Sequence, residues 1–96
     1  MRRSNEQSLR SAIEEFLKNF RLQDKLNETR AIHSWEKIVG TMVAKHTLDI
    51  SIRKRVLFVK VDSSALRSEL SFAKEKIIAA LNREVEAKVV EEIVIQ

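Results

Sequence analysis

The sequence predicts one α+β domain with the element order helix, helix, strand, strand, helix, strand (ααββαβ). Apolar residues recur at steps of three and four in three segments, and they alternate or cluster in three short β-rich runs. The chain contains one Gly and no Pro, which favours long helices joined by short turns. With 96 residues it fits a single domain, 1–96, built around one core.

A strand, a helix N-cap and a helix form the central unit in the second half of the chain. The other elements are expected to cover or flank this unit. A strand is predicted at residues 56–61, with every second residue from Leu57 to Val61 on one face. Ser63 and Ser64 then offer side-chain oxygens to a helix that starts near residue 64 and ends near 83. The stripe expected to cover the strand consists of Leu66, Leu70, Ala73, Ile77 and Leu81.

Two helices are expected to precede this unit. The first spans residues 5–20, behind a capping box and a frayed tail at residues 1–4. After a short break that follows Phe20, a second long helix runs over residues 23–45. Gly40 lies inside this helix and costs roughly 1 kcal/mol relative to Ala, so it predicts a kink or a close backbone approach.

Strands are predicted at residues 47–52 and 89–95. The first alternates cleanly and forms a hairpin with the strand at 56–61 through a tip of about three residues, Arg53-Lys54-Arg55. If the last strand runs parallel to its neighbour, the helical crossover between them is right-handed. The residues of the first strand expected to point inward are Leu48, Ile50 and Ile52.

Composition and motifs argue against an enzyme and favour a binding protein. There is no Cys, and a phosphate-binding loop rich in Gly is excluded. His33 and His46 have no metal-ligand spacing, and capping accounts for Ser63 and Ser64, so neither catalytic residues nor a metal or cofactor is expected. No apolar run could cross a membrane, and we expect a cytoplasmic protein. Trp35 is expected to be a core residue.

A basic surface at the hairpin is the candidate nucleic-acid site. The net charge is only +4, so the distribution of the cations matters more than their number. Phe58 is either a stacking platform or a residue covered by a helix or a partner subunit, and the basic tip is either a phosphate contact or a solvated turn. Phe72 is expected under the first helix or in a patch for a partner protein. The candidate residues are Arg53, Lys54, Arg55, Phe58, Lys60 and Arg67, with Arg2, Arg3 and Arg10 as the alternative.

An ordered set of short motifs resembles a known family. The set comprises Trp35-Glu36-Lys37-Ile38-Val39-Gly40, Val43-Ala44-Lys45-His46-Thr47, Leu57-Phe58-Val59-Lys60-Val61-Asp62-Ser63-Ser64-Ala65-Leu66, Glu69-Leu70 and Leu81-Asn82. It is similar to the DciA family of bacterial proteins, long catalogued as a domain of unknown function, and the resemblance covers residues 9 to 95.

The resemblance implies a KH-like domain that binds the DnaB-type replicative helicase, assists its loading or operation in DNA replication, and binds DNA. Longer relatives carry a basic or flexible extension, and KH domains grip nucleic acid with a Gly-x-x-Gly loop that this chain does not have. The DNA binding expected here is therefore weak. Two alternatives remain open: a KH-like RNA- or single-strand-binding module, and a structural domain that self-associates through its sheet.

Overall fold

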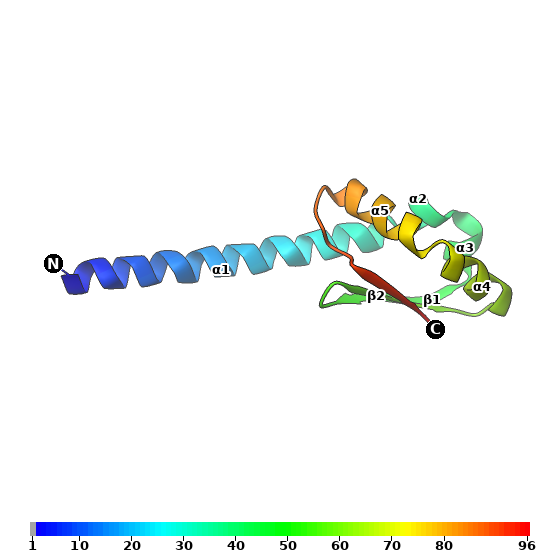
Figure 1. Cartoon of the computed structure of the whole chain (residues 1–96), viewed down its shortest axis with the longest axis horizontal. Helices are drawn as coiled ribbons and strands as arrows, with labels where there is room; N and C mark the ends of the chain where they lie inside the picture. Colours follow the sequence, from blue (N-terminus) through cyan, green and yellow to red (C-terminus); the bar gives the residue numbers. More distant parts are fainter. Residues whose placement is uncertain (1) are drawn as a thin grey trace.

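The computed structural model describes residues 2–96, with side chains described from residue 5 onward. Residues 2–4, expected as a frayed tail before a helix start at residue 5, belong to the first helix, and residue 1 lies outside the described residues. Figure 1 shows a small globular part, made of a sheet with helices on one face, and a long helix that projects from it. The elements are α1 (Arg2–His33), α2 (Trp35–Val39), α3 (Thr41–Lys45), β1 (Thr47–Arg53), β2 (Val56–Val61), α4 (Ser64–Phe72), α5 (Lys74–Val85) and β3 (Glu92–Ile95).

The sheet has the strand order β1-β2-β3. β1 and β2 form an antiparallel hairpin in which Ile52 pairs with Leu57. β3 returns through α4 and α5 to lie parallel to β2, where Ile93 pairs with Leu57. The α+β class and the sequence of strands agree with the prediction, whereas the full order is αααββααβ and not ααββαβ.

The core lies between the sheet and the helices. Leu57, Val59 and Val61 point into it from β2, as expected from their alternation. The predicted stripe covers them, since Leu66, Leu70, Ile77 and Leu81 are buried and Ala73 packs against the cluster. Trp35 is also buried, with 5% of its surface exposed.

The predicted break after Phe20 is wrong, because α1 continues without interruption to His33. Leu22 and Leu26 do not continue the stripe that ends at Phe20, so the apolar pattern changes phase there. No Gly or Pro stands between residues 20 and 33, so a helix passes through and simply presents these leucines on its other side.

The predicted helix over residues 23–45 is also wrong, because the chain turns at Ser34 and again at Gly40. Ser34 ends α1, and its hydroxyl donates to the Arg30 carbonyl over 2.8 Å. Of the two expectations at Gly40, the kink is confirmed, because this residue separates α2 from α3 at φ 93° and ψ 165°, a conformation essentially restricted to glycine. The close backbone approach is wrong, because a Cβ built at Gly40 meets nothing within 4 Å.

The predicted helix at 64–83 is two helices, α4 and α5, which meet at Ala73. Ser63 is the N-cap of α4, and its hydroxyl accepts from the Leu66 N–H over 3.3 Å. Ser64 is the first residue of the helix. The stripe survives the break because Ala73 lies within it and packs on the core from the junction.

Two strand predictions need correction. Leu48 is 59% exposed and not inward, because the pairing register shifts between Thr47 and Asp49. Such a bulge inserts an extra residue and resets the alternation of the strand. The last strand begins at Glu92 and not at residue 89, although Val89 and Val90 before it are fully buried.

Candidate nucleic-acid interface

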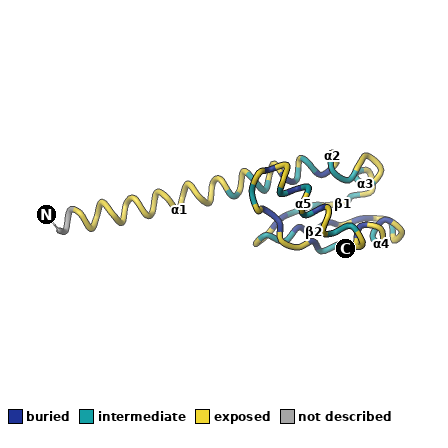
Figure 2. Tube along the Cα trace, turned by 45° about the horizontal axis from the view of Figure 1, so that its top comes forward, coloured by how far each residue is buried: buried dark blue, intermediate teal, exposed yellow. Residues whose placement is uncertain are grey.

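The face of the sheet opposite the core is open. In Figure 1 the helices of the described chain all lie on one side of the sheet. Figure 2 shows the darkest, most buried segments between these helices and the strands. The pairing register places the remaining side chains on the open face, where they include Asp49, Ser51, Arg53, Val56, Phe58, Lys60, Glu92 and Val94.

Phe58 and Arg53 form the centre of this open face. The Arg53 guanidinium carbon lies 4.9 Å from the centroid of the Phe58 ring, within the range of a cation–π interaction. Phe58 is half-buried, so an arginine covers its ring and no helix does. This arrangement exposes a flat, positively charged guanidinium on which a base or a phosphate could lie.

The hairpin tip has two residues and not the three that were expected, because Arg53 still belongs to β1. Lys54 and Arg55 form the turn with φ values of 50° and 66°, as a type I′ turn requires. Glycine or asparagine usually occupies such positions, but here lysine and arginine occupy them. Lys54 is exposed at the end of the hairpin.

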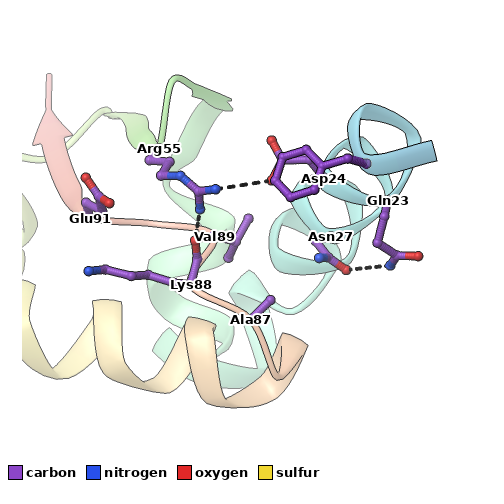
Figure 3. A pocket seen from close by; sticks show the side chains of 9 residues that line it. Gln23, Asp24, Asn27, Arg55, Ala87, Lys88, Val89 and Glu91 are labelled. Atoms are coloured by element: carbon purple, nitrogen blue, oxygen red, sulfur yellow. Dashed lines mark hydrogen bonds and ion pairs between the residues drawn. The ribbon is translucent and has the colours of Figure 1, made fainter. Parts of the chain in front are cut away.

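Two of the six candidate residues donate hydrogen bonds to backbone carbonyls of the fold. The Arg55 guanidinium donates to the Lys88 carbonyl and lies 3.8 Å from an Asp24 carboxylate oxygen (Figure 3). Arg67 is half-buried, and its Nη1 donates to the Val61 carbonyl over 2.6 Å. Both arginines therefore contribute to the fold, whatever else they contact.

The remaining cations gather on the hairpin. Among the described residues, no ion pair involves Arg53, Lys54 or Lys60. Lys60 is exposed and pairs across the sheet with Asp49, which reduces the local positive charge. The structure thus brings together a small basic surface of Arg53, Lys54 and Lys60 around Phe58, which we call the hairpin surface.

A second basic aromatic surface lies at the α4–α5 junction. Phe72 is 89% exposed, so of its two alternatives burial under the first helix is wrong, and a patch for a partner protein stays a prediction. A shallow cavity of about 450 Å³ beside it is lined by Ser71, Phe72, Lys74, Glu75 and Lys76, which we call the junction surface. No side chain caps the start of α5, so its first N–H groups remain available to an anion. The signal in the sequence that could have indicated the junction surface is Phe72 followed closely by Lys74 and Lys76.

Trp35 and His46 have structural surroundings, whereas His33 is exposed. The Trp35 indole N–H donates to the Thr47 hydroxyl over 3.0 Å, and this hydroxyl donates to the Val43 carbonyl over 2.7 Å. His46 Nδ1 lies 2.7 Å from an Asp62 carboxylate oxygen at the open end of the hairpin. Among the described residues, no cluster of three or more His, Asp or Glu side chains could hold a metal ion.

Asn82, named from the sequence only as part of the Leu81-Asn82 motif, has a structural role that the motif did not indicate. Its Oδ1 accepts from the N–H groups of Val89 and Val90 over 3.0 and 2.9 Å, and its Nδ2 donates to the Val90 carbonyl over 2.9 Å. These bonds satisfy buried backbone groups that the sheet does not reach. They explain why Val89 and Val90 are buried without belonging to a strand.

The fold and these surfaces define a small α+β domain with a half-covered sheet and two exposed basic patches next to aromatic rings. A family model described as Dna[CI] antecedent, DciA, matches residues 8–95. The chain belongs to the DciA family, which is associated with loading of the DnaB helicase in DNA replication. None of the curated proteins compared with the chain matches it. Among the described residues, no helix is both long and apolar enough to span a bilayer.

Proposed function

We propose that this chain is a non-enzymatic replication protein that binds the DnaB-type replicative helicase and assists its loading or operation in the bacterial cytoplasm. The family match over residues 8–95 is the observation that carries the proposal. We further propose that it binds DNA weakly and without sequence preference, through exposed cations that can neutralise phosphates.

We propose a KH-like arrangement for the globular part. In support, two helices joined at Ala73 lie on one face of a three-stranded sheet. KH domains hold nucleic acid with a Gly-x-x-Gly loop between helices, and the present junction reads Ser71-Phe72-Ala73-Lys74. Without glycine the backbone cannot approach phosphates in the same way, so any contact there depends on Phe72 and the neighbouring lysines.

The hairpin surface is tested by the salt dependence of DNA binding. Binding of labelled duplex and single-stranded DNA is measured between 20 and about 200 mM salt, where each phosphate neutralised contributes a log–log slope of about −0.9 or −0.7, respectively. The triple variant Arg53→Ser, Lys54→Ser, Lys60→Ser should flatten the duplex slope by roughly two to three units. Arg55 and Arg67 are left intact because both make contacts within the fold.

The control removes the same charge elsewhere. Lys18, Arg21 and Lys25 are exposed on α1, and changing all three to Ser lowers the net charge equally. This control should leave the slope nearly unchanged. Equal flattening in both triple variants would mean that only net charge matters and that the hairpin surface is not a site.

The junction surface needs its own variant, Phe72→Ala with Lys74→Ser and Lys76→Ser. If single strands stack on Phe72, this variant should lose roughly 1 to 3 kcal/mol of single-strand affinity and little duplex affinity. Loss in the junction variant combined with an unchanged hairpin variant would move the DNA site to α4 and α5.

A pull-down with the replicative helicase of the same organism tests the partner. Retention of the helicase, together with a change in its loading onto a DNA fork, is the expected result. Salt-dependent DNA or RNA binding without any helicase interaction would favour the KH-like nucleic-acid module. Failure to bind helicase and nucleic acid would leave the structural domain as the remaining function.

A further inference from the structure

The N-terminal two thirds of α1 lie clear of the globular part. Every described residue from 5 to 23 is exposed, which Figure 2 shows as an almost continuous yellow helix. The molecule measures 66 Å along its longest axis but only 21 and 19 Å across. Such a helix gains little stability from tertiary packing, and isolated helices of this length are marginal in water.

This projecting helix carries an uncovered apolar stripe. A rotation of 100° per residue places Ile13 five full turns from Ala31, on the same side of the helix. Ala31 is 1% exposed because this side of α1 packs on the globular part. The stripe therefore prolongs the buried side of α1 past the end of the domain. Its members are Leu9, Ile13, Phe16, Leu17 and Phe20, each between 44% and 67% exposed.

We propose that this stripe binds the same stripe of a second copy of the chain, with the two α1 helices antiparallel. Leu9, Ile13, Phe16 and Phe20 follow one another at steps of four, three and four, the spacing of a coiled-coil seam. These steps read the same in both directions. In an antiparallel pair Leu9 of one copy therefore meets Phe20 of the other, and Ile13 meets Phe16. A two-fold axis between residues 14 and 15 makes both contacts twice, as an isologous dimer requires.

The shape of the molecule favours the antiparallel arrangement. From Asp24 onward the globular part occupies the side of α1 on which the stripe lies, since Asp24 and Asn27 are half-buried there. A parallel partner helix would collide with the domain at this point. In an antiparallel pair the two globular parts lie at opposite ends of the seam, and a cross-section of about 20 Å leaves room for one more helix, about 10 Å wide, beside α1.

A cleft lies where the stripe meets the globular part. It has a volume of about 380 Å³ and is lined by Phe20 and Asp24 of α1, Arg55 of the hairpin, and Lys88 and Val89 of the loop before β3 (Figure 3). The first turns of a second α1 would reach this cleft when Leu9 faces Phe20. The interface therefore consists of a contact between the two helices and a contact between each helix and the globular part of the other copy.

The area is sufficient for a stable pair. Five large apolar side chains that are about half exposed offer roughly 500 Å² on each copy, more than scattered surface residues do. Complete covering of these side chains on both copies would bury about 1,000 Å² in total before the cleft is counted, which is the lower limit for a specific contact. This inference is independent of the helicase and DNA proposals.

Sedimentation equilibrium over about 1 to 200 μM tests the dimer. The chain should sediment at twice its mass of 11.1 kDa. Ile13→Glu with Phe16→Glu should raise the dissociation constant at least about 100-fold, because each dimer then places four carboxylates in an apolar seam. Circular dichroism and Trp35 fluorescence check that the globular part of this variant remains folded.

Leu22→Glu is the matched control. Leu22 is 56% exposed, like the residues of the stripe, but nine residues from Ile13 correspond to two and a half turns, so it lies on the opposite side of α1. This variant should remain dimeric. A wild-type chain that is monomeric at 200 μM, or equal dissociation of the Leu22 and stripe variants, overturns the proposal; the occupant of the stripe would then be a different protein.

The orientation is measured with spin labels. The chain has no Cys, so Asn5→Cys provides one exposed labelling site per copy. With Leu9 opposite Phe20, the two labelled positions lie about 28 Å apart along the helix pair, whereas parallel helices would bring them within about 10 to 15 Å. A dominant short distance would overturn the antiparallel arrangement.

Discussion

Single side chains hold together the parts of this domain that regular secondary structure does not. Thr47 links Trp35 to α3, and Asn82 holds the loop before β3 through three hydrogen bonds. No buried side-chain polar atom among the described residues lacks a partner. Because unpaired buried polar groups are costly, these few residues should be sensitive to substitution.

Asn82→Ala should lower the free energy of unfolding by about 2 to 4 kcal/mol, since it leaves the N–H groups of Val89 and Val90 buried without an acceptor. Asn82→Asp keeps the acceptor oxygen and should lose less. Urea denaturation measures both, with Asn19→Ala on the exposed part of α1 as the control. Equal stability of Asn82→Ala and wild type would show that water replaces the amide.

Gly40→Ala should cost about 1 to 3 kcal/mol for a purely backbone reason. A Cβ built at Gly40 meets nothing within 4 Å, so there is no steric clash with the surroundings, but its φ of +93° disfavours any L-residue. A synthetic chain with D-alanine at this position should retain wild-type stability in thermal denaturation. A destabilised D-alanine chain would point to a packing effect.

At the scale of elements, the core stripe spans a break between two helices. Leu66 and Leu70 belong to α4, Ile77 and Leu81 belong to α5, and all four lie in the same buried cluster as the inward residues of β2. The side chains keep helical spacing through Ala73 even though the backbone does not. Packing against the strand therefore decides the positions of both helices, and the junction adapts to it.

Leu66→Ala or Ile77→Ala should destabilise the domain by roughly 2 to 5 kcal/mol, because each substitution leaves a cavity in the centre of the core. Phe72→Ala is the matched control from the same pair of helices. Since Phe72 is 89% exposed, its loss should change stability by no more than about 0.5 kcal/mol. Chemical denaturation that gave a loss below 0.5 kcal/mol for Ile77→Ala would remove the stripe from the core.

At the scale of the whole molecule, the chain consists of a globular part and a helix that extends far beyond it. The Cα radius of gyration is 18.0 Å, whereas a compact domain of this length has about 12 to 13 Å. No described core residue precedes Ala31. The globular part should therefore fold without the projecting N-terminal part of α1.

A chain that lacks residues 1–20 should unfold cooperatively, with a melting temperature that does not depend on concentration and a radius of gyration near 12 Å by small-angle scattering. The full chain should melt at higher temperature as its concentration rises, because association stabilises the folded state. Loss of the cooperative transition in the shortened chain would instead make residues 1–20 part of the folding unit.

The sequence by itself predicted the α+β class, the hairpin, the N-cap at Ser63, the interruption at Gly40, the core stripe and the DciA resemblance. These features depend on local chemistry: side-chain periodicity, capping oxygens and the freedom of glycine at positive φ. The candidate residues on one strand, such as Phe58 and Lys60, could be assigned to a face for the same reason.

Only the tertiary structure decided where helices end and which cations stay exposed. At Leu22 the apolar residues move to another side of the helix, which looks like a break if every helix is assumed to bury one face in the core. Most of α1 lies outside the core, so it needs no single buried face. Arg55 is held by Lys88 and Asp24, which lie 33 and 31 residues away, so no local pattern could separate it from Lys54. Bulges, such as the one that exposes Leu48, likewise depend on the pairing strand.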